Sequence, residues 1–205
     1  MAGRVDRIAR GHLFVISGPS GVGKGTLRKR LFGIIKDLEY SISCTTRRPR
    51  NSERDGYDYR FVKPDLFREL EREGKFLEWA EVHGNLYGTL KKDVEAALSL
   101  GKDLVLEIDV QGALKVREIM PEAILIFIMP PSLADLEERL KRRGSESGED
   151  MRTRMDEARH EIELSSLYDH TVVNDDLPTA LVTLEKIVES YRQPARTNKS
   201  KYPEV

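Results

Sequence analysis

A glycine-rich loop between a short apolar segment and a helical pattern is the feature that most constrains this chain. The apolar segment Leu13–Ser17 predicts a buried strand, and a helical pattern begins at Leu27. The loop between them consists of Gly18, Pro19, Ser20, Gly21, Val22, Gly23, Lys24, Gly25 and Thr26. In a strand, loop and helix of this kind, backbone N–H groups and the positive helix end surround phosphate oxygens, and the lysine reaches the terminal phosphates. The sequence therefore predicts binding of a nucleoside triphosphate and transfer of its terminal phosphate.

The position of the hydroxyl residue in this loop bears on metal binding. Gly25 follows Lys24, and the hydroxyl comes one place later, at Thr26. In the commonest pattern the hydroxyl follows the lysine directly and binds Mg²⁺. We therefore expect no protein side chain to bind the metal directly. Thr26 is expected to contact a phosphate, and Mg²⁺ to be held mainly by the ATP phosphates and water.

Short apolar segments alternate with helical patterns along most of the chain. Buried strands are also predicted at Leu104–Asp109 and Ala123–Met129, with shorter ones at Tyr40–Ser43 and His170–Asn174. Apolar stripes at helical spacing begin at Leu133, Met151 and Leu177. This alternation predicts an α/β fold in three layers, a parallel sheet with helices on both faces.

Two polar stretches interrupt the alternation. Residues 45–89 carry only short apolar runs, Tyr59–Val62 and Phe76–Val82, and predict an inserted mixed α/β lobe with its own small sheet. Residues 142–154 are almost entirely polar, contain Gly144 and Gly148, and predict a mobile lid between two helices. The expected division is a single domain with core segments 12–44, 90–141 and 155–192 and a frayed tail at 193–205.

Composition and charge exclude several classes of protein. The net charge of −1 provides no field that would attract nucleic acid or anionic lipid. Cys44 is the only cysteine, so no intramolecular disulfide can form; we expect a small buried residue and a cytoplasmic location. The four histidines have no metal-ligand spacing. No apolar run is long enough for a membrane span, and we expect no signal peptide, because no apolar core follows Arg4, Arg7 and Arg10.

A basic and hydroxyl-rich segment follows the predicted strand at 40–43. Arg47, Arg48 and Arg50 lie beside Ser43, and Tyr59 follows. Closely spaced arginines offer forked donors that match a phosphate, which suggests a phosphorylated acceptor. A solvated basic loop explains the arginines alone equally well.

Two carboxylates suggest the base of the acceptor. Asp109 ends a predicted strand of the parallel sheet, at the edge where ligands bind, and Glu78 lies in a short apolar run of the lobe. Guanine presents N1–H and 2-amino donors, and carboxylates only accept hydrogen bonds. The residues alone leave open that Asp109 is a metal-associated acid and Glu78 a surface residue.

The motifs together resemble guanylate kinase, a nucleoside monophosphate kinase, over about residues 12–192. They are GPSGVGKGT, SxxTTRxxR with a following tyrosine, FLEWAxVxGNxYGT, EIDVQG and VVNDDL. The resemblance implies reversible transfer of the ATP γ-phosphate to GMP, giving ADP and GDP in purine metabolism, with dGMP as a possible second acceptor. It also implies the fold of a core parallel sheet, a nucleotide-binding lobe and a lid.

The resemblance further assigns roles to individual residues. The GMP site falls on Ser43, Arg47, Arg50, Tyr59, Glu78, Tyr87, Thr89 and Asp109. Lys24, Arg47 and the lid residues Arg143 and Arg154 are implied to stabilise the transferring phosphoryl group, and Asn174 to lie on the adenine side. Arg139 and Arg142 are expected to be surface charges on a helix.

Three alternatives remain at this point. A kinase for adenylate or thymidylate would share the donor loop but not the need for Glu78. A non-catalytic scaffold domain would lack an intact loop, whereas Lys24 is present here. A regulatory GTPase would need an NKxD-like motif, which Asn174-Asp175-Asp176 is not. The chain is a monomer or a homo-oligomer; its sequence favours neither.

Overall fold

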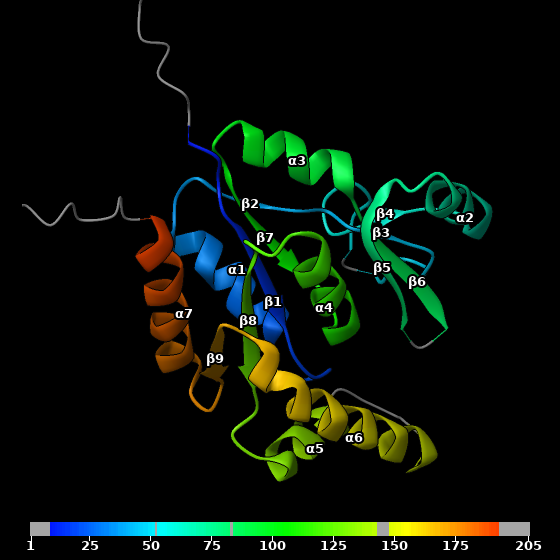
Figure 1. The fold of residues 1–205 in the computed structure, drawn as a ribbon. Helices are drawn as coiled ribbons and strands as arrows, with labels where there is room; N and C mark the ends of the chain where they lie inside the picture. The colour runs from blue at the N-terminus through cyan, green and yellow to red at the C-terminus, as the bar shows by residue number, and fades with distance from the viewer. Residues whose placement is uncertain (1–8, 52, 83, 143–147, 193–205) are drawn as a thin grey trace, which may run out of the picture.

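The computed structural model describes residues 9–51, 53–82, 84–142 and 148–192. Five parallel strands form the central sheet in the order β2-β7-β1-β8-β9 (Figure 1). They are β1 (Leu13–Ser17), β2 (Leu38–Tyr40), β7 (Asp103–Glu107), β8 (Ile124–Met129) and β9 (His170–Val173). The predicted α/β fold is confirmed, and β1, which carries the glycine-rich loop at its end, lies in the middle of the sheet.

Side chains of β1 alternate between the two faces of the sheet and so supply two separate cores. Phe14 and Ile16 pack in one buried cluster, and Leu13 and Val15 pack in another. This follows from the strand period of two, and it explains why every residue of β1 is buried.

Helices cover both faces of the sheet (Figure 1). The cluster around Phe14 takes in residues of α1 (Lys24–Ile34), α5 (Leu133–Arg142), α6 (Gly148–Glu163) and α7 (Leu177–Arg192). The cluster around Val15 takes in residues of α3 (Lys91–Ser99) and α4 (Val110–Ile119). A short 3-10 turn, Leu164–Leu167, joins α6 to β9.

The strand predicted at Tyr40–Ser43 is wrong in position. Strand β2 covers Leu38–Tyr40 instead, and its last sheet contact is the N–H of Ser41 donating to Val105 O at 3.0 Å. Beyond that point the chain leaves the sheet toward the lobe. The other predicted strands agree with the structure to within one or two residues at each end.

A second, four-stranded sheet occupies the stretch predicted to form a lobe. Its order is β4-β3-β6-β5, with β3 at Cys44–Thr45, β4 at Arg60–Phe61, β5 at Phe76–Val82 and β6 at Asn85–Leu90. Helix α2 (Pro64–Arg72) packs on it through Phe67, whose ring stacks on that of Phe76 at 4.5 Å. The lobe thus has a small core of its own, which also buries Cys44.

Strand β5 also belongs to the main core. Leu77 is 2% exposed and lies in the same cluster as Val15. On the same strand, the carbonyl of Trp79 accepts a hydrogen bond from Lys115 Nζ of α4 at 2.6 Å. One edge of the lobe is therefore fixed to α4.

The stretch predicted to be a lid between two helices is largely helical. Arg142 is the last residue of α5, and residues 148–154 form the first turns of α6. Residues 143–147 lie outside the described part of the chain, as does the tail at 193–205. The polar composition that suggested a loop belongs instead to the start of a surface helix that packs along one stripe only.

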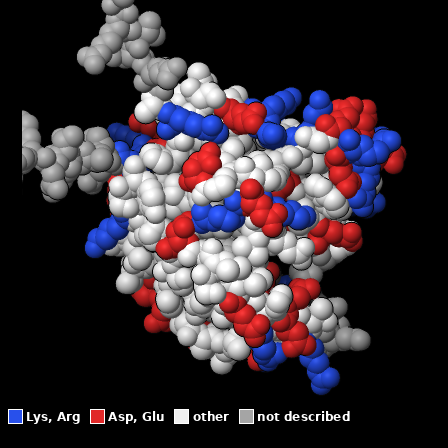
Figure 2. Space-filling model, in the orientation of Figure 1, with Lys and Arg blue, Asp and Glu red and all other residues white. Residues whose placement is uncertain are grey.

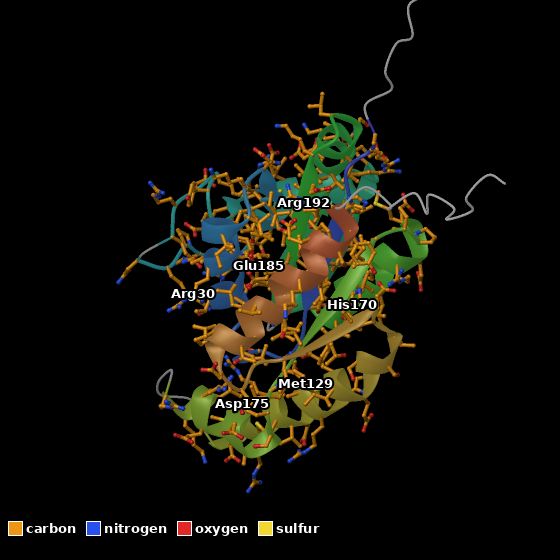
Figure 3. All side chains as sticks on the ribbon, turned by 90° about the vertical axis from the view of Figure 1, so that its left-hand side faces the viewer. Arg30, Met129, His170, Asp175, Glu185 and Arg192 are labelled. Atoms are coloured by element: carbon orange, nitrogen blue, oxygen red, sulfur yellow. The ribbon has the colours of Figure 1, made fainter. Side chains whose placement is uncertain are left out.

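At the amino edge of the core sheet, Asp103 joins the first and the last segments of the described chain. Its carboxylate accepts hydrogen bonds from His12 N at 2.7 Å and from Arg192 Nε at 2.8 Å, and lies 3.0 Å from His12 Nδ1. Figure 3 shows Arg192 at the end of α7, far from Asp175, which precedes the start of that helix. Burial opposes ionisation of Asp103, but these hydrogen bonds prevail and lower the pKa of its carboxyl.

Within the described residues, no helix combines the length and the apolar character that a bilayer crossing requires. Charges of both signs are interspersed over the face shown in Figure 2. This agrees with the near-zero net charge of −1.

Candidate active site

One cavity at the carboxyl edge of the core sheet is lined by half of the residues that the sequence assigned to the site. It has a volume of about 240 Å³ and lies between the glycine-rich loop, the lobe and α6. The notch between the lobe and α6 opens at the right of Figure 2. The predicted site residues that line it are Gly18, Ser20, Lys24, Ser43, Arg50, Tyr59, Glu78, Tyr87, Asp109 and Arg154.

The glycine-rich loop takes a conformation that side chains would prevent. Gly18 has φ 135°, and a Cβ there would lie 2.3 Å from Ile128 O. Gly23 has φ 101° and precedes the first turn of α1, whose N-terminus has no side-chain cap. Uncapped N–H groups and the positive helix end therefore face the loop. Helix α1 begins at Lys24, three residues earlier than the predicted start at Leu27.

Lys24 folds over the loop that carries it. Its Nζ donates to Gly18 O at 2.5 Å and to Pro19 O at 3.1 Å. The ammonium therefore lies above the concave side of the loop, where phosphate oxygens would be held.

Asn174 and Arg139 support the loop from the side. The buried amide of Asn174 donates to Val22 O at 2.7 Å, and Arg139 Nη2 donates to Asn174 O at 2.9 Å. Arg139 Nη1 also approaches Val22 O at 3.5 Å. The expectation that Arg139 is a surface charge is therefore wrong: its guanidinium joins α5 to the end of β9 and the loop.

The arginines of the lobe differ in their placement. The Arg50 side chain lines the cavity, whereas Arg47 is anchored beside it. Arg47 Nε donates to Tyr87 OH at 3.2 Å, and Nη2 forms an ion pair with Glu53 Oε1 at 2.9 Å. The Arg47 guanidinium also lies 5.5 Å from the centre of the Tyr59 ring.

Glu78 is a buried carboxylate that faces the cavity. It is 4% exposed, and its Oε1 accepts a hydrogen bond of 2.6 Å from the Thr89 hydroxyl, which lies 3.3 Å from Ser43 Oγ. Burial, aided by the nearby charge of Asp109, raises the pKa of Glu78 to about 7 despite the hydrogen bond from Thr89. A hydrogen-bond donor on a ligand would stabilise the charged form of this carboxylate.

Asp109 lies across the cavity from the lobe, at the start of α4. Its carboxylate accepts a hydrogen bond of 3.0 Å from Gly112 N and so caps the helix. Gly112 in turn lets Glu78 come close, because a Cβ at this position would lie 2.7 Å from Glu78 Oε2. The structure thus brings Glu78 and Asp109 to one cavity, which the sequence alone left open.

Comparison with known proteins gives this arrangement a family. A family model described as guanylate kinase matches residues 10–191. The chain belongs to the guanylate kinase family. A guanylate kinase of Oceanobacillus iheyensis is 49% identical over 181 residues, which cover 88% of each chain. One from Thermus thermophilus is 50% identical over 184 residues, covering 90% of this chain and 83% of its own.

A solved structure agrees with the family and the fold. The crystal structure of guanylate kinase from Anaplasma phagocytophilum matches with a TM-score of 0.76 at 32% identity and covers 91% of this chain and 89% of its own. The guanylate kinase fold, with its glycine-rich loop after the central strand, is therefore the fold of this chain.

Four acidic residues at or beside the cavity escaped the sequence reasoning. Glu107 ends β7 and pairs with Arg28 Nε at 2.7 Å, while Glu157 and Glu161 on α6 line the same cavity. Glu53 lies in the lobe against Arg47. Glu107 stands two places before Asp109 and so shares its side of the strand end, a signal that was available. Glu53, Glu157 and Glu161 had no such signal, because only the tertiary fold brings them to the cavity.

Several predicted site residues are not among those that line the cavity, Arg47 and Thr89 among them. Arg143 lies outside the described residues. Thr26 is exposed on the first turn of α1, and Asn174 reaches the loop but not the cavity. Their expected contacts with ATP remain predictions.

Proposed function

We propose that this chain transfers the γ-phosphate of ATP reversibly to GMP in this cavity, giving ADP and GDP, as part of purine metabolism in the cytoplasm. One observation carries the proposal. The same cavity of about 240 Å³ is lined by the buried Glu78, by Arg50 and Tyr59, whose side chains can donate to a phosphate, and by Lys24 of the loop. The buried carboxylate, which only accepts hydrogen bonds, matches the donors of guanine. The cationic and hydroxyl side chains match the GMP phosphate, and the glycine-rich loop matches the phosphates of ATP.

The donor side is assigned to the loop at Gly18–Thr26. Its N–H groups and the N-terminus of α1 hold the ATP phosphates, and Lys24 leaves its contacts with Gly18 O and Pro19 O for the β- and γ-phosphates. Asn174 keeps Val22 in place and borders the adenine side. Preformed donors of this kind need little rearrangement when ATP binds.

The acceptor side is assigned to the lobe and to Asp109. Glu78 and Asp109 accept hydrogen bonds from the guanine N1–H and 2-amino groups, with Thr89 holding Glu78. Adenine has no such donors and would leave the buried carboxylate unpaired, which discriminates strongly. The GMP phosphate is held by Ser43, Arg47, Arg50, Tyr59 and Tyr87.

The transfer itself requires positive charge rather than a general base. The GMP phosphate is already anionic, so the barrier lies in bringing two polyanions together. Lys24 and Arg47, with Arg154 of α6 and Arg143, offset that repulsion. Closure of residues 142–154 over the site keeps water from accepting the phosphate.

A magnesium ion fits this site as a companion of ATP. The described residues contain no cluster of three or more His, Cys, Asp or Glu that would hold a metal ion directly. The cavity does present the carboxylates of Glu107 and Asp109, oxygen groups that accept hydrogen bonds from metal-bound water. When bound to ATP, Mg²⁺ supplies charge neutralisation, and most of its ligands are phosphate and water oxygens.

A coupled assay with ATP and one of GMP, AMP, UMP or dTMP tests the proposal. We expect GMP to be used and the other three to react at least about 10³-fold less efficiently, given the cost of leaving a buried acceptor unpaired. Glu78→Gln should remove most GMP use. Its control is Glu81→Gln, an exposed position on the same strand. Preference of the wild type for another acceptor would overturn the assignment.

A further inference from the structure

The side chain of Arg47 is held in place by three hydrogen bonds, one from each nitrogen of its guanidinium. Its Nε donates to Tyr87 OH at 3.2 Å, Nη1 to Arg48 O at 2.8 Å and Nη2 to Glu53 Oε1 at 2.9 Å. A guanidinium has five N–H groups, so one on each terminal nitrogen is left for a ligand. Arginine N–H groups of this kind are donors from which a phosphate accepts hydrogen bonds.

Glu53 connects this arginine to the next one. Its second oxygen, Oε2, accepts a hydrogen bond of 2.8 Å from the backbone N–H of Arg50. The Glu53 N–H donates back to Arg50 O at 3.0 Å, which closes the turn between them. One carboxylate therefore fixes the side chain of Arg47 and the backbone turn that carries Arg50, the two arginines assigned to the GMP phosphate.

The carboxylate is charged and shielded. The side chains of Glu53 and Arg47 are only 15% and 16% exposed, so the pair is largely withdrawn from solvent. Burial disfavours the charge, but the bonds from Arg47 and Arg50 prevail and lower the pKa of Glu53. A negative charge near a phosphate site weakens anion binding. This loss is offset only if the charge also holds the phosphate-binding groups in place and so favours binding by a larger amount. A free arginine side chain loses rotamer entropy when a ligand fixes it, and holding the Arg47 side chain beforehand removes that loss from GMP binding.

We propose that Glu53 is a positioning residue for the acceptor phosphate: it holds Arg47 and the Arg50 turn so that both arginines meet the phosphate of GMP. This inference rests on the proposed function, because it takes the lobe as the GMP site. Glu53 does not touch the acceptor; it acts through the two arginines.

Two substitutions of Glu53 separate positioning from charge. In Glu53→Gln the amide keeps one acceptor oxygen, so it can serve Arg47 or the Arg50 N–H but not both. In Glu53→Asp the charge stays, but the side chain is one methylene too short to reach both. Positioning predicts that both variants raise the KM for GMP by about tenfold or more, the size expected for one hydrogen bond to a charged group. The KM for ATP should stay within about twofold.

Guanosine supplies a readout that a merely structural defect would not spare. It carries the base but no phosphate, so its inhibition constant against GMP should be the same in wild type, Glu53→Gln and Glu53→Asp. Glu69→Gln, an exposed acid on α2, is the matched control and should change none of these constants. Thermal unfolding of each variant checks that the lobe is folded.

Each outcome decides the proposal. A raised KM for GMP in both variants with unchanged guanosine inhibition supports it. A lower KM for GMP would mean that Glu53 masks Arg47 and would overturn it, as would a rise in Glu53→Gln alone, which indicates a charge effect. Parallel loss of guanosine and GMP binding would show a structural role instead. Failure of the wild type to use GMP at all would refute the proposed function, and is seen before any variant is compared.

Discussion

Replacing Glu78 by glutamine should stabilise the ligand-free protein, although it should also remove most use of GMP. Glu78 is 4% exposed, and burial raises its pKa to about 7 from an ordinary 4.5. Its hydrogen bond from the Thr89 hydroxyl survives the change, since the amide oxygen of glutamine also accepts. The substitution therefore removes the cost of a buried charge and keeps the local packing.

The size and sign of the effect follow from the pKa. Because the folded-state pKa of this acid is raised, ionisation of Glu78 costs stability; the cost is absent below pH 4.5, grows through pH 7 and is complete above it. The gap between 4.5 and about 7 corresponds to about 3 kcal/mol, at about 1.4 kcal/mol for each pKa unit. We therefore expect Glu78→Gln to be more stable than wild type by about 3 kcal/mol at pH 8 and by about 1 kcal/mol or less at pH 5.

Urea unfolding of ligand-free wild type, Glu78→Gln and Glu81→Gln at pH 5 and pH 8 measures this difference. The exposed Glu81 controls for the loss of one negative charge on the same strand. If Glu78→Gln were less stable at pH 8, or if its advantage were the same at both pH values, the reasoning from burial would be refuted. A confirmed result would show that the buried acid is kept at a cost in stability, which is the expected sign of a functional group.

Further predictions concern the packing, the chain ends and the metal. Gly112→Ala places a Cβ 2.7 Å from Glu78 Oε2, so we expect a loss of about 1–3 kcal/mol in urea unfolding and a higher KM for GMP; Gly33→Ala, with nothing within 4 Å, should show neither. Asp103→Asn should cost about 1–3 kcal/mol at pH 7. Since the folded pKa of Asp103 is lowered, this difference should be present above about pH 4 and vanish as the pH falls through the folded pKa, which acid unfolding of both proteins would reveal. Chelation of Mg²⁺ with EDTA should abolish turnover and added Mg²⁺ restore it; full activity in EDTA would contradict the assigned role of the ion.

The sequence predicted those features that rest on local pattern. Strand β1 was placed to the residue because an uninterrupted apolar run meets Gly18, and the lobe because its polarity differs from that of the core. The start of α1 at Lys24 was missed because the glycines that precede Leu27 show no helical pattern. The support for this first turn comes from elsewhere in the chain, where Asn174 donates a hydrogen bond to Val22 O. Strand β2 was shifted because Tyr40–Ser43 has the alternation of a strand but leaves the sheet after Ser41.

The sequence predicted more of the residues that line the cavity than of those that support them. Lys24 and Glu78, which do line it, stood out because each lies in a motif and its chemistry is unusual for its surroundings. Arg139 was taken for a surface charge, because a single arginine on a helix carries no sign of what it touches in three dimensions. Glu53 was missed for the same reason. Neither residue has a pattern of its own, and both act through partners that only the fold brings near.

The attachment of strand β5 to α4 limits how this enzyme could be re-engineered. Residues 45–89, which the sequence marks off as a lobe, are the obvious piece to exchange when the aim is another acceptor. A chimera cut at those points would bring in a foreign β5 and remove Leu77 from its place beneath α4, together with the Trp79 carbonyl that Lys115 binds. Extending the piece to Ile119 would carry α4 along but would also replace β7, which pairs with β1 and β2 in the core sheet, so the acceptor is better changed by substitutions within the lobe than by exchanging it.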